Sequence, residues 1–163
     1  MATAIFISVS GYSLPHDIGH NSPAVDTAHN YSVLVVDDDP SIRKMVIAAL
    51  KRDALAYTFA EAANGRDALD VMRDQLPDVV VLDLMMPIVS GWDVLRERAG
   101  DEDLRKIPVI VVSANRDPEL ATAMQGGICA FLPKPFDIGA LRALVRSCVS
   151  PAASPAAEHP EPQ

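Results

Sequence analysis

Residues 79–87 read VVVLDLMMP, in which a continuous apolar run ends at an aspartate, Asp83. A run of valine and leucine without polar alternation is typical of a strand that is buried on both faces of a parallel sheet. The segments VLVV at 33–36 and VIVV at 109–112 repeat this pattern. We therefore expect these three runs to form the centre of a parallel sheet.

Stretches of helical period separate the apolar runs, which is the pattern of repeated strand and helix units. We expect strands at residues 32–36, 57–61, 78–82, 109–112 and 130–132. Helix start signals follow them at Asp39-Pro40, Asn64-Gly65, Gly91, Asp117-Pro118 and Asp137. In the first helix, one face is apolar and is expected to pack on the sheet; it carries Ile42, Met45, Val46, Ala49 and Leu50.

The chain has 163 residues, which is enough for one domain. We assign residues 32–149 to that domain. Residues 1–31 mix Ser, His, Asn, Pro and Gly and are interpreted as a flexible leader, and residues 150–163, rich in Pro and Ala, as a disordered tail. Nothing in the sequence indicates a second domain.

Charge and hydropathy exclude some classes of function. The formal net charge is −8, which disfavours a nucleic acid partner because that affinity comes mostly from clustered Lys and Arg. No stretch approaches the roughly 18 consecutive apolar residues that a membrane-spanning helix needs, so no membrane insertion is expected. No Lys or Arg precedes Arg43, so the charged start of a secretory signal is missing. We expect a cytoplasmic protein.

The chain has two cysteines, Cys129 and Cys148, in apolar-rich stretches. Their spacing fits neither a zinc site nor a dense disulfide framework. We expect both to be reduced thiols in the core.

Polar residues stand immediately after the predicted strands. Asp37 and Asp38 follow the first strand, Asp83 the third, Ser113 the fourth and Lys134 the fifth. Ligands of open parallel sheets bind beyond the carboxyl ends of the strands, so these residues are expected to meet at one edge. The sequence therefore predicts a functional site there.

Bunched carboxylates need neutralising charge, since two unit charges about 4 Å apart repel by about 4 kcal/mol at an effective dielectric constant near 20. Lys134 offsets one of the three carboxylates of Asp37, Asp38 and Asp83, and one divalent cation would offset the other two. Oxygen ligands of this kind favour Mg²⁺, which takes one or two carboxylates and bridges to phosphate. We expect Mg²⁺ as the cofactor.

Asp83 is the best candidate for the reactive group. An aspartate attacks phosphorus when a metal and a cation offset the charge on the transferring group. Lys134 would hold one phosphoryl oxygen, and Ser113 would donate a hydrogen bond to another.

The motifs VLVVDDDP (33–40), VVVLDLMMP (79–87) with Gly91, VIVVSA (109–114) and FLPKPF (131–136) resemble those of the receiver domain of two-component response regulators. The resemblance covers about residues 32–149. It implies a flavodoxin-like doubly wound fold, (βα)5, with a five-stranded parallel sheet in the strand order 2-1-3-4-5.

The resemblance also implies roles for single residues. Asp83 would be the phosphoacceptor, and Asp37 and Asp38 would bind Mg²⁺ together with Asp83 and the backbone carbonyl of Met85. Lys134 would be the catalytic lysine. Its neighbour Pro135 would follow a cis peptide bond, and Ser113 and Phe131 would form the switch pair.

A phosphorelay function follows from these roles as an expectation. A sensor histidine kinase or a histidine phosphotransfer protein would donate the phosphoryl group, and a downstream effector protein would bind the switched surface. With no output domain after Val149, the chain is expected to act as a stand-alone response regulator. It would be a phosphoprotein that assists only its own phosphorylation and dephosphorylation, and so not an enzyme.

Two other functions remain open. Asp37-x-Asp39-x-Ser41 also resembles the first motif of haloacid-dehalogenase-type phosphatases, although their later acidic pair is missing here. A binding module that keeps the fold without the chemistry is the second alternative. At the level of single residues, Phe131 could serve only in core packing, and Ser113 could be a simple hydroxyl at a strand end.

Overall fold

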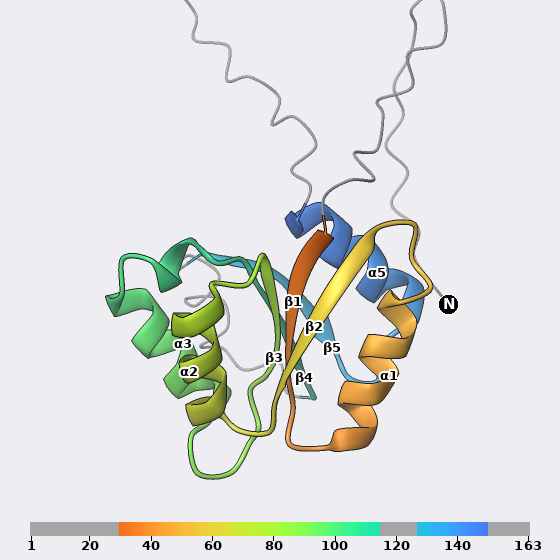
Figure 1. Cartoon of the computed structure of the whole chain (residues 1–163). Helices are drawn as coiled ribbons and strands as arrows, with labels where there is room; N and C mark the ends of the chain where they lie inside the picture. Colours follow the sequence, from red (N-terminus) through yellow and green to blue (C-terminus); the bar gives the residue numbers. More distant parts are fainter. Residues whose placement is uncertain (1–29, 115–126, 150–163) are drawn as a thin grey trace, which may run out of the picture.

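The computed structural model describes residues 30–114 and 127–149, which form a parallel sheet with helices on both faces (Figure 1). The sheet has five strands in the order β2-β1-β3-β4-β5, all paired in parallel. This confirms the predicted flavodoxin-like architecture. The strands are β1 (Asn30–Val36), β2 (Ala56–Ala62), β3 (Val79–Asp83), β4 (Val109–Ser113) and β5 (Ile128–Pro133).

The helices form two layers. Figure 1 shows α2 (Gly65–Gln75) and α3 (Gly91–Gly100) on one side of the sheet, and α1 (Pro40–Leu50) and α5 (Ile138–Val149) on the other. A short 3₁₀ turn, η1 (Leu104–Lys106), connects α3 to β4. The predicted helix after Asp117-Pro118 lies outside the described residues.

The central strands bury both of their faces, as the uninterrupted apolar runs predict. Val80 and Leu82 of β3 point into the cluster beneath α2 and α3, whereas Val79 and Val81 point into the cluster beneath α1 and α5. Side chains of a strand alternate between faces, so each apolar run supplies two cores. All residues of β3 are buried, including its last residue, Asp83.

Side-chain caps fix where the helices begin. Asp39 caps α1 by accepting from the Ser41 amide, and Asn64 caps α2 by accepting from the Asp67 amide. Ser90 and Asp93 form a reciprocal capping box at the start of α3, where only Gly91 was expected as a start signal. Each cap satisfies helix N–H groups that would otherwise lack partners.

Several local predictions need correction. Met45 is 40% exposed, so it does not lie on the buried face of α1 with Val46 and Leu50. The first strand also begins earlier than the predicted residue 32, because β1 starts at Asn30 and pairs Asn30 with Ala56. The rest of the predicted leader, and the predicted tail at 150–163, lie outside the described residues.

The cysteine prediction was wrong. Cys129 and Cys148 form a disulfide, with their Cα atoms 6.3 Å apart. Cys129 is exposed and Cys148 is half-buried, so neither is a fully buried core thiol. The two are 19 residues apart in sequence, and they meet because α5 runs back along β5.

Among the described residues, no helix is long and apolar enough to cross a bilayer.

Candidate functional site

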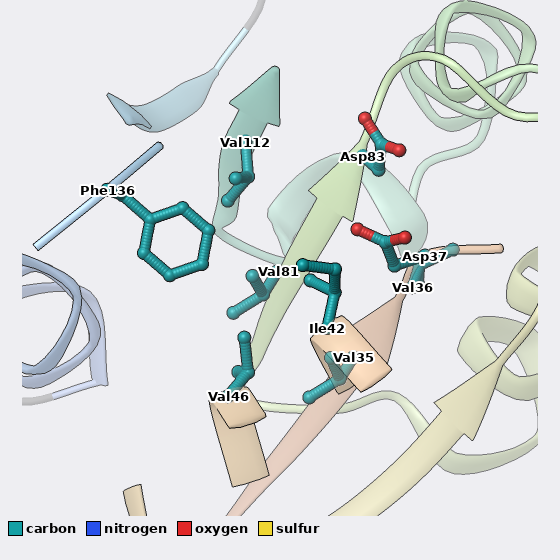
Figure 2. A pocket seen from close by; sticks show the side chains of 9 residues that line it. All are labelled: Val35, Val36, Asp37, Ile42, Val46, Val81, Asp83, Val112 and Phe136. Atoms are coloured by element: carbon teal, nitrogen blue, oxygen red, sulfur yellow. The ribbon is translucent and has the colours of Figure 1, made fainter. Parts of the chain in front are cut away.

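The polar residues predicted to converge do meet at the carboxyl edge of the sheet. Asp37 follows β1, Asp83 ends β3, Ser113 ends β4 and Lys134 follows β5, and these strands are consecutive neighbours. Asp37, Asp83 and Ser113 are almost fully buried, with exposed fractions of 3%, 5% and 1%. Figure 2 shows the carboxylates of Asp37 and Asp83 side by side at the ends of their strands.

Lys134 joins the two buried acids. Its Nζ donates to Asp37 Oδ2 at 2.7 Å and lies 3.2 Å from Asp83 Oδ2. The backbone amide of Lys134 donates to the carbonyl of Ser113 at 3.0 Å, which ties the residue after β5 to the end of β4. The peptide bond between Lys134 and Pro135 is cis, which confirms that prediction.

The three acids lie close enough together to bind one divalent cation. Asp37, Asp38 and Asp83 each offer a carboxylate oxygen, and these oxygens lie within 4.8 Å of one another. Lys134 compensates only one of the three charges. The cluster therefore keeps a charge of −2, partly in buried positions, and its oxygen-only donor set fits Mg²⁺. Asp38 is exposed, so the site opens to solvent on its side.

The pKa values of the buried pair reflect this environment. Burial raises the pKa of Asp83 above its ordinary value, and the charge of Asp37 adds to the rise, although the Met85 amide and Lys134 oppose it. For Lys134, burial favours the neutral form, but the hydrogen bond to Asp37 and the charges of Asp83 and Asp37 outweigh burial and raise the pKa. Lys134 therefore stays protonated, whereas burial disfavours the charged form of the Asp83 carboxyl group.

Two backbone contacts position Asp83. The amide of Met85 donates to Asp83 Oδ1 at 3.2 Å, and the amide of Gly91 donates to the carbonyl of Leu84 at 3.1 Å. A Cβ atom at Gly91 would collide with the Asp83 carbonyl and come within 2.7 Å of Leu84 Cα. Only glycine allows the start of α3 to approach the end of β3 this closely.

Arg43 supports the acidic edge, although sequence reasoning missed it. Its Nη1 donates to the backbone carbonyl of Asp37 at 2.7 Å, and its Nε donates to Glu61 Oε2 at 2.9 Å. Arg43 thus links the residue after β1 to β2. The only sequence signal is its place near the start of the helix that follows the acids, and such a place is ordinary for an arginine.

An apolar cavity of about 10 Å³ lies beneath the carboxylates of Asp37 and Asp83. Figure 2 shows Phe136 facing it from beyond β4, with Ile42 and Val46 of α1 along another side. A cavity of this size is at the lower limit for a single water molecule. Asp83 therefore borders an apolar cavity, and burial is the main cause of its raised pKa. Phe136 was not predicted to be part of the site.

The remaining predicted residues lie near the site, but their roles stay predictions. Phe131 is half-buried and packs against the cluster beneath α2 and α3, and it pairs with Val111 in the sheet. Met85 is 58% exposed, and coordination of Mg²⁺ by its backbone carbonyl stays a prediction. Ser113 is buried at the end of β4, facing the same edge as Asp83.

Comparison with known proteins identifies relatives. A family model described as the response regulator receiver domain matches residues 33–146. Response regulator Rre1 of a Synechocystis strain is 36% identical over 124 residues, which cover 76% of this chain and 53% of that protein. The chain spans about half the length of the first relatives that it matches.

Solved structures agree with the sequence relatives. The receiver domain of the Francisella response regulator 1452 is 29% identical, with a TM-score of 0.66 and coverage of 76% of this chain and 100% of that one. The receiver domain of the sensor histidine kinase PA1611 from Pseudomonas aeruginosa, described with a magnesium ion coordinated in its active-site cleft, is 25% identical. Its TM-score is 0.65, and the match covers 74% of this chain and 98% of that one.

Proposed function

The chain belongs to the response regulator receiver domain family of two-component systems, and from this premise we propose that it accepts a phosphoryl group on Asp83. One observation carries the proposal. Asp83 is buried at the end of the central strand, contacts Lys134, and lies within a cluster of three carboxylates that are close enough together to bind a divalent cation.

The proposed donor is a phosphohistidine on a sensor kinase or a phosphotransfer protein. A carboxylate oxygen of Asp83 attacks the phosphorus, an O–P bond forms and the N–P bond to the histidine breaks. The electron pair of the broken bond stays on the imidazole nitrogen, and a proton on the other ring nitrogen makes the departing imidazole neutral. Lys134 is placed to hold an oxygen of the transferring group, because its Nζ already lies 3.2 Å from Asp83 Oδ2.

Asp37, Asp38 and Asp83, with the backbone carbonyl of Met85, are the proposed ligands of Mg²⁺. When bound, this ion offsets negative charge on the transferring phosphoryl group. The donor set supports the assignment, as does the magnesium ion described in the related receiver of PA1611. Arg43 holds the backbone of Asp37 in place, so it is a positioning residue for this site.

The proposed output is a change of partner binding. Phosphorylation replaces one carboxylate charge with a group of about −2, which attracts nearby donors more strongly. Ser113 lies at the end of the neighbouring strand, and Phe131 packs two residues before the end of β5. We assign the switch to these two residues and the readout to an effector protein that binds the surface around β5 and α5.

We propose that the chain assists only its own phosphorylation and dephosphorylation and turns over no external substrate. We also propose a cytoplasmic location, which is consistent with the family. Stand-alone action stays a prediction, since the chain spans about half the length of its first relatives.

Labelling with a small phosphodonor tests the proposal. Incubation of the full chain with acetyl phosphate and Mg²⁺ should add one phosphoryl group per chain, measured by intact mass. D83N should show no labelling, and neither should the parent protein in EDTA. D39N is the matched control, because Asp39 is an exposed helix cap next to the cluster and should leave labelling unchanged.

The alternatives give different results. A phosphatase would release phosphate steadily from monoesters instead of stopping at one group per chain. A binding module without the chemistry would show no labelling in any variant. If D83N is labelled like the parent, Asp83 is not the acceptor.

A further inference from the structure

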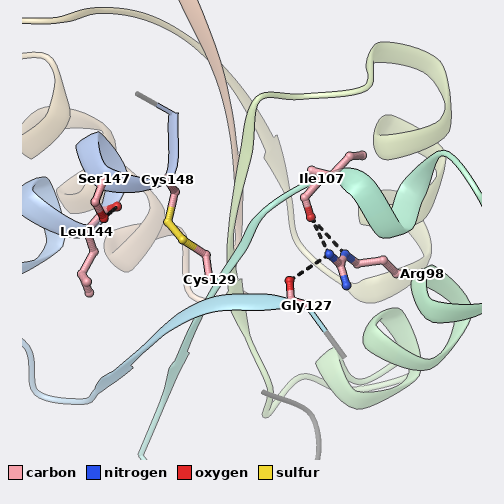
Figure 3. The surroundings of a disulfide bond; sticks show 7 residues. All are labelled: Arg98, Ile107, Gly127, Cys129, Leu144, Ser147 and Cys148. Atoms are coloured by element: carbon pink, nitrogen blue, oxygen red, sulfur yellow. Dashed lines mark hydrogen bonds between the residues drawn. A yellow bond between two sulfur atoms is a disulfide. The ribbon is translucent and has the colours of Figure 1, made fainter. Parts of the chain in front are cut away.

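The disulfide between Cys129 and Cys148 joins the start of β5 to the last turn of α5 (Figure 3). It lies at the amino end of β5, opposite the end that Lys134 follows. The site chemistry described above does not use it. Its position and accessibility nevertheless indicate a function.

One end of the bond lies at the surface. Cys129 is exposed, while Cys148 is half-buried and packs against the cluster beneath α1 and α5. Thiol–disulfide exchange requires that a thiolate reach one sulfur of the bond, and exposed disulfides are the labile ones. Figure 3 shows the bond between the strand and the helix.

The fold does not depend on the disulfide to hold α5. Leu141 and Val145 are completely buried against the sheet. Arg142 donates from its Nε to the carbonyl of Ala49 at 2.8 Å, which attaches α5 to α1. These contacts lie one to two turns before Cys148. A reduced chain therefore keeps α5 on the sheet. Its last turn loses the disulfide and keeps the buried Val149 as its attachment.

The start of β5 has a separate attachment on the other side. Arg98 Nη2 donates to the carbonyl of Gly127 at 3.0 Å, two residues before Cys129 (Figure 3). The disulfide therefore adds its restraint to a strand that is already fixed, and the element that it restrains is the end of α5.

We propose that Cys129 and Cys148 form a thiol–disulfide exchange site, at which a small-molecule disulfide such as oxidised glutathione clamps the end of α5 to β5. The proposal rests on the cytoplasmic location proposed above, because disulfides in reducing compartments are usually transient rather than permanent. The same pair of residues then exists in two states, with the clamp closed or open.

The exchange balances in two steps. The thiolate of Cys129 attacks a sulfur of oxidised glutathione, forming a mixed disulfide and releasing one glutathione thiolate. The thiolate of Cys148 then attacks the Cys129 sulfur and displaces the second glutathione. The two cysteine thiols are oxidised, two electrons pass to glutathione disulfide, and the two cysteine protons end on the two glutathione thiols.

The closed clamp acts on the readout surface and not on the phosphoacceptor. The ring that it closes runs from residue 129 to residue 148, so it contains Phe131, Lys134 and the surface formed by β5 and α5. Asp37, which follows β1, and Asp83, the last residue of β3, lie outside the ring at the carboxyl edge of the sheet. Lys134 follows β5 at that same edge, whereas the disulfide lies at the amino end of β5. Oxidation should therefore change the mobility of α5 without changing Mg²⁺ binding.

Glutathione titration of the full chain tests the proposal. After equilibration in buffers of different ratios of reduced to oxidised glutathione, free thiols are trapped with a maleimide and counted by mass. Mixed buffers should hold both forms of the protein, and C148A should stop at the mixed disulfide on Cys129. Hydrogen exchange in the last turn of α5 should be about tenfold or more slower in the oxidised form.

C129A/C148A is the control, and its hydrogen exchange should not respond to glutathione. D83N separates this proposal from the phosphoacceptor proposal, because it should exchange thiols like the parent even if Asp83 labelling fails. A bond that persists in reduced glutathione alone would be a permanent structural link and would overturn the proposal. Equal hydrogen exchange in the two forms, or no oxidation in oxidised glutathione, would overturn it as well.

Discussion

The two ends of β3 each carry a buried or half-buried aspartate, but their surroundings differ. Asp78, just before the strand, accepts from the amide and hydroxyl of Ser32 at 2.7 and 2.8 Å, and its own amide donates to the Ser32 hydroxyl at 3.0 Å. Asp83, at the other end, shares the single ammonium of Lys134 with Asp37. Donors match the acid at the amino edge, whereas carboxylates outnumber cations at the carboxyl edge.

Arg98 extends the contrast, because it too lies at the amino edge. It is 2% exposed, and its guanidinium donates to the carbonyls of Ile107, Arg105 and Gly127, which precede β4 and β5. Burial lowers the pKa of Arg98, but an arginine stays charged in proteins. The amino edge therefore holds charges that stabilise the fold, and the carboxyl edge holds charges that are available for chemistry.

The largest effect is expected at Arg98. R98A removes donors from three backbone carbonyls and leaves a void, so it should lower the free energy of unfolding by about 3–5 kcal/mol. Urea denaturation followed by circular dichroism would measure the change. R96A is the matched control, because Arg96 is 75% exposed in its pair with Asp93 and should cost less than about 0.5 kcal/mol. Equal stability of R98A and R96A would contradict the contrast between the edges.

Opposite effects are expected at the two ends of β3. Without metal, D83N removes one of the crowded charges and should raise the free energy of unfolding by about 1–2 kcal/mol. D78N instead places an amide group against the donors of Ser32 and should lower it by about 1–2 kcal/mol. Urea denaturation in EDTA would show both changes.

Mg²⁺ sharpens the same comparison. A ligand that binds only the folded state stabilises it, so Mg²⁺ should stabilise the parent and D78N but have little effect on D83N. The advantage of D83N should therefore shrink as Mg²⁺ is added. Destabilisation of the metal-free protein by D83N would contradict the expected charge repulsion between the carboxylates at the carboxyl edge.

The smallest effect concerns Tyr57 at the amino end of β2. Burial and the charge of Asp53 raise its pKa to about 12, with Arg146 opposing the rise and Tyr31 adding to it. Because the unfolded tyrosine loses its proton near pH 10, the stability that this group contributes is complete below pH 10 and declines toward pH 12. Two pKa units correspond to about 2.7 kcal/mol, and because Tyr57 is only half-buried the free energy of unfolding of the parent should fall by roughly 1 kcal/mol more than that of Y57F over this range.

Tyr57 also tests how well the amino edge is satisfied. Its hydroxyl is buried without a hydrogen-bond partner in the described structure, as is Asp53 Oδ2. Y57F should therefore be neutral or slightly stabilising at pH 7. Parallel pH profiles of the parent and Y57F, measured by urea denaturation, would contradict the raised pKa.

The sheet and the acidic cluster were predictable because both depend on local patterns. An uninterrupted valine and leucine run indicates a strand buried on both faces, and the residue after such a run reaches the carboxyl edge. Asp83 and Asp37 could be placed by this rule alone. The exposure of Met45 could not be predicted, because its place on an otherwise apolar helix face does not show where the neighbouring elements end.

The amino-acid sequence by itself determined the order of strands and helices, the family, and the set of polar residues at the carboxyl edge. The tertiary structure alone decided that Arg43 supports Asp37, that Phe136 faces the cavity under Asp83, and that Arg98 is buried. It also decided that Cys129 and Cys148 are bonded. Each of these facts depends on the distance between segments that lie far apart in the chain, and composition or periodicity carries no information about such distances.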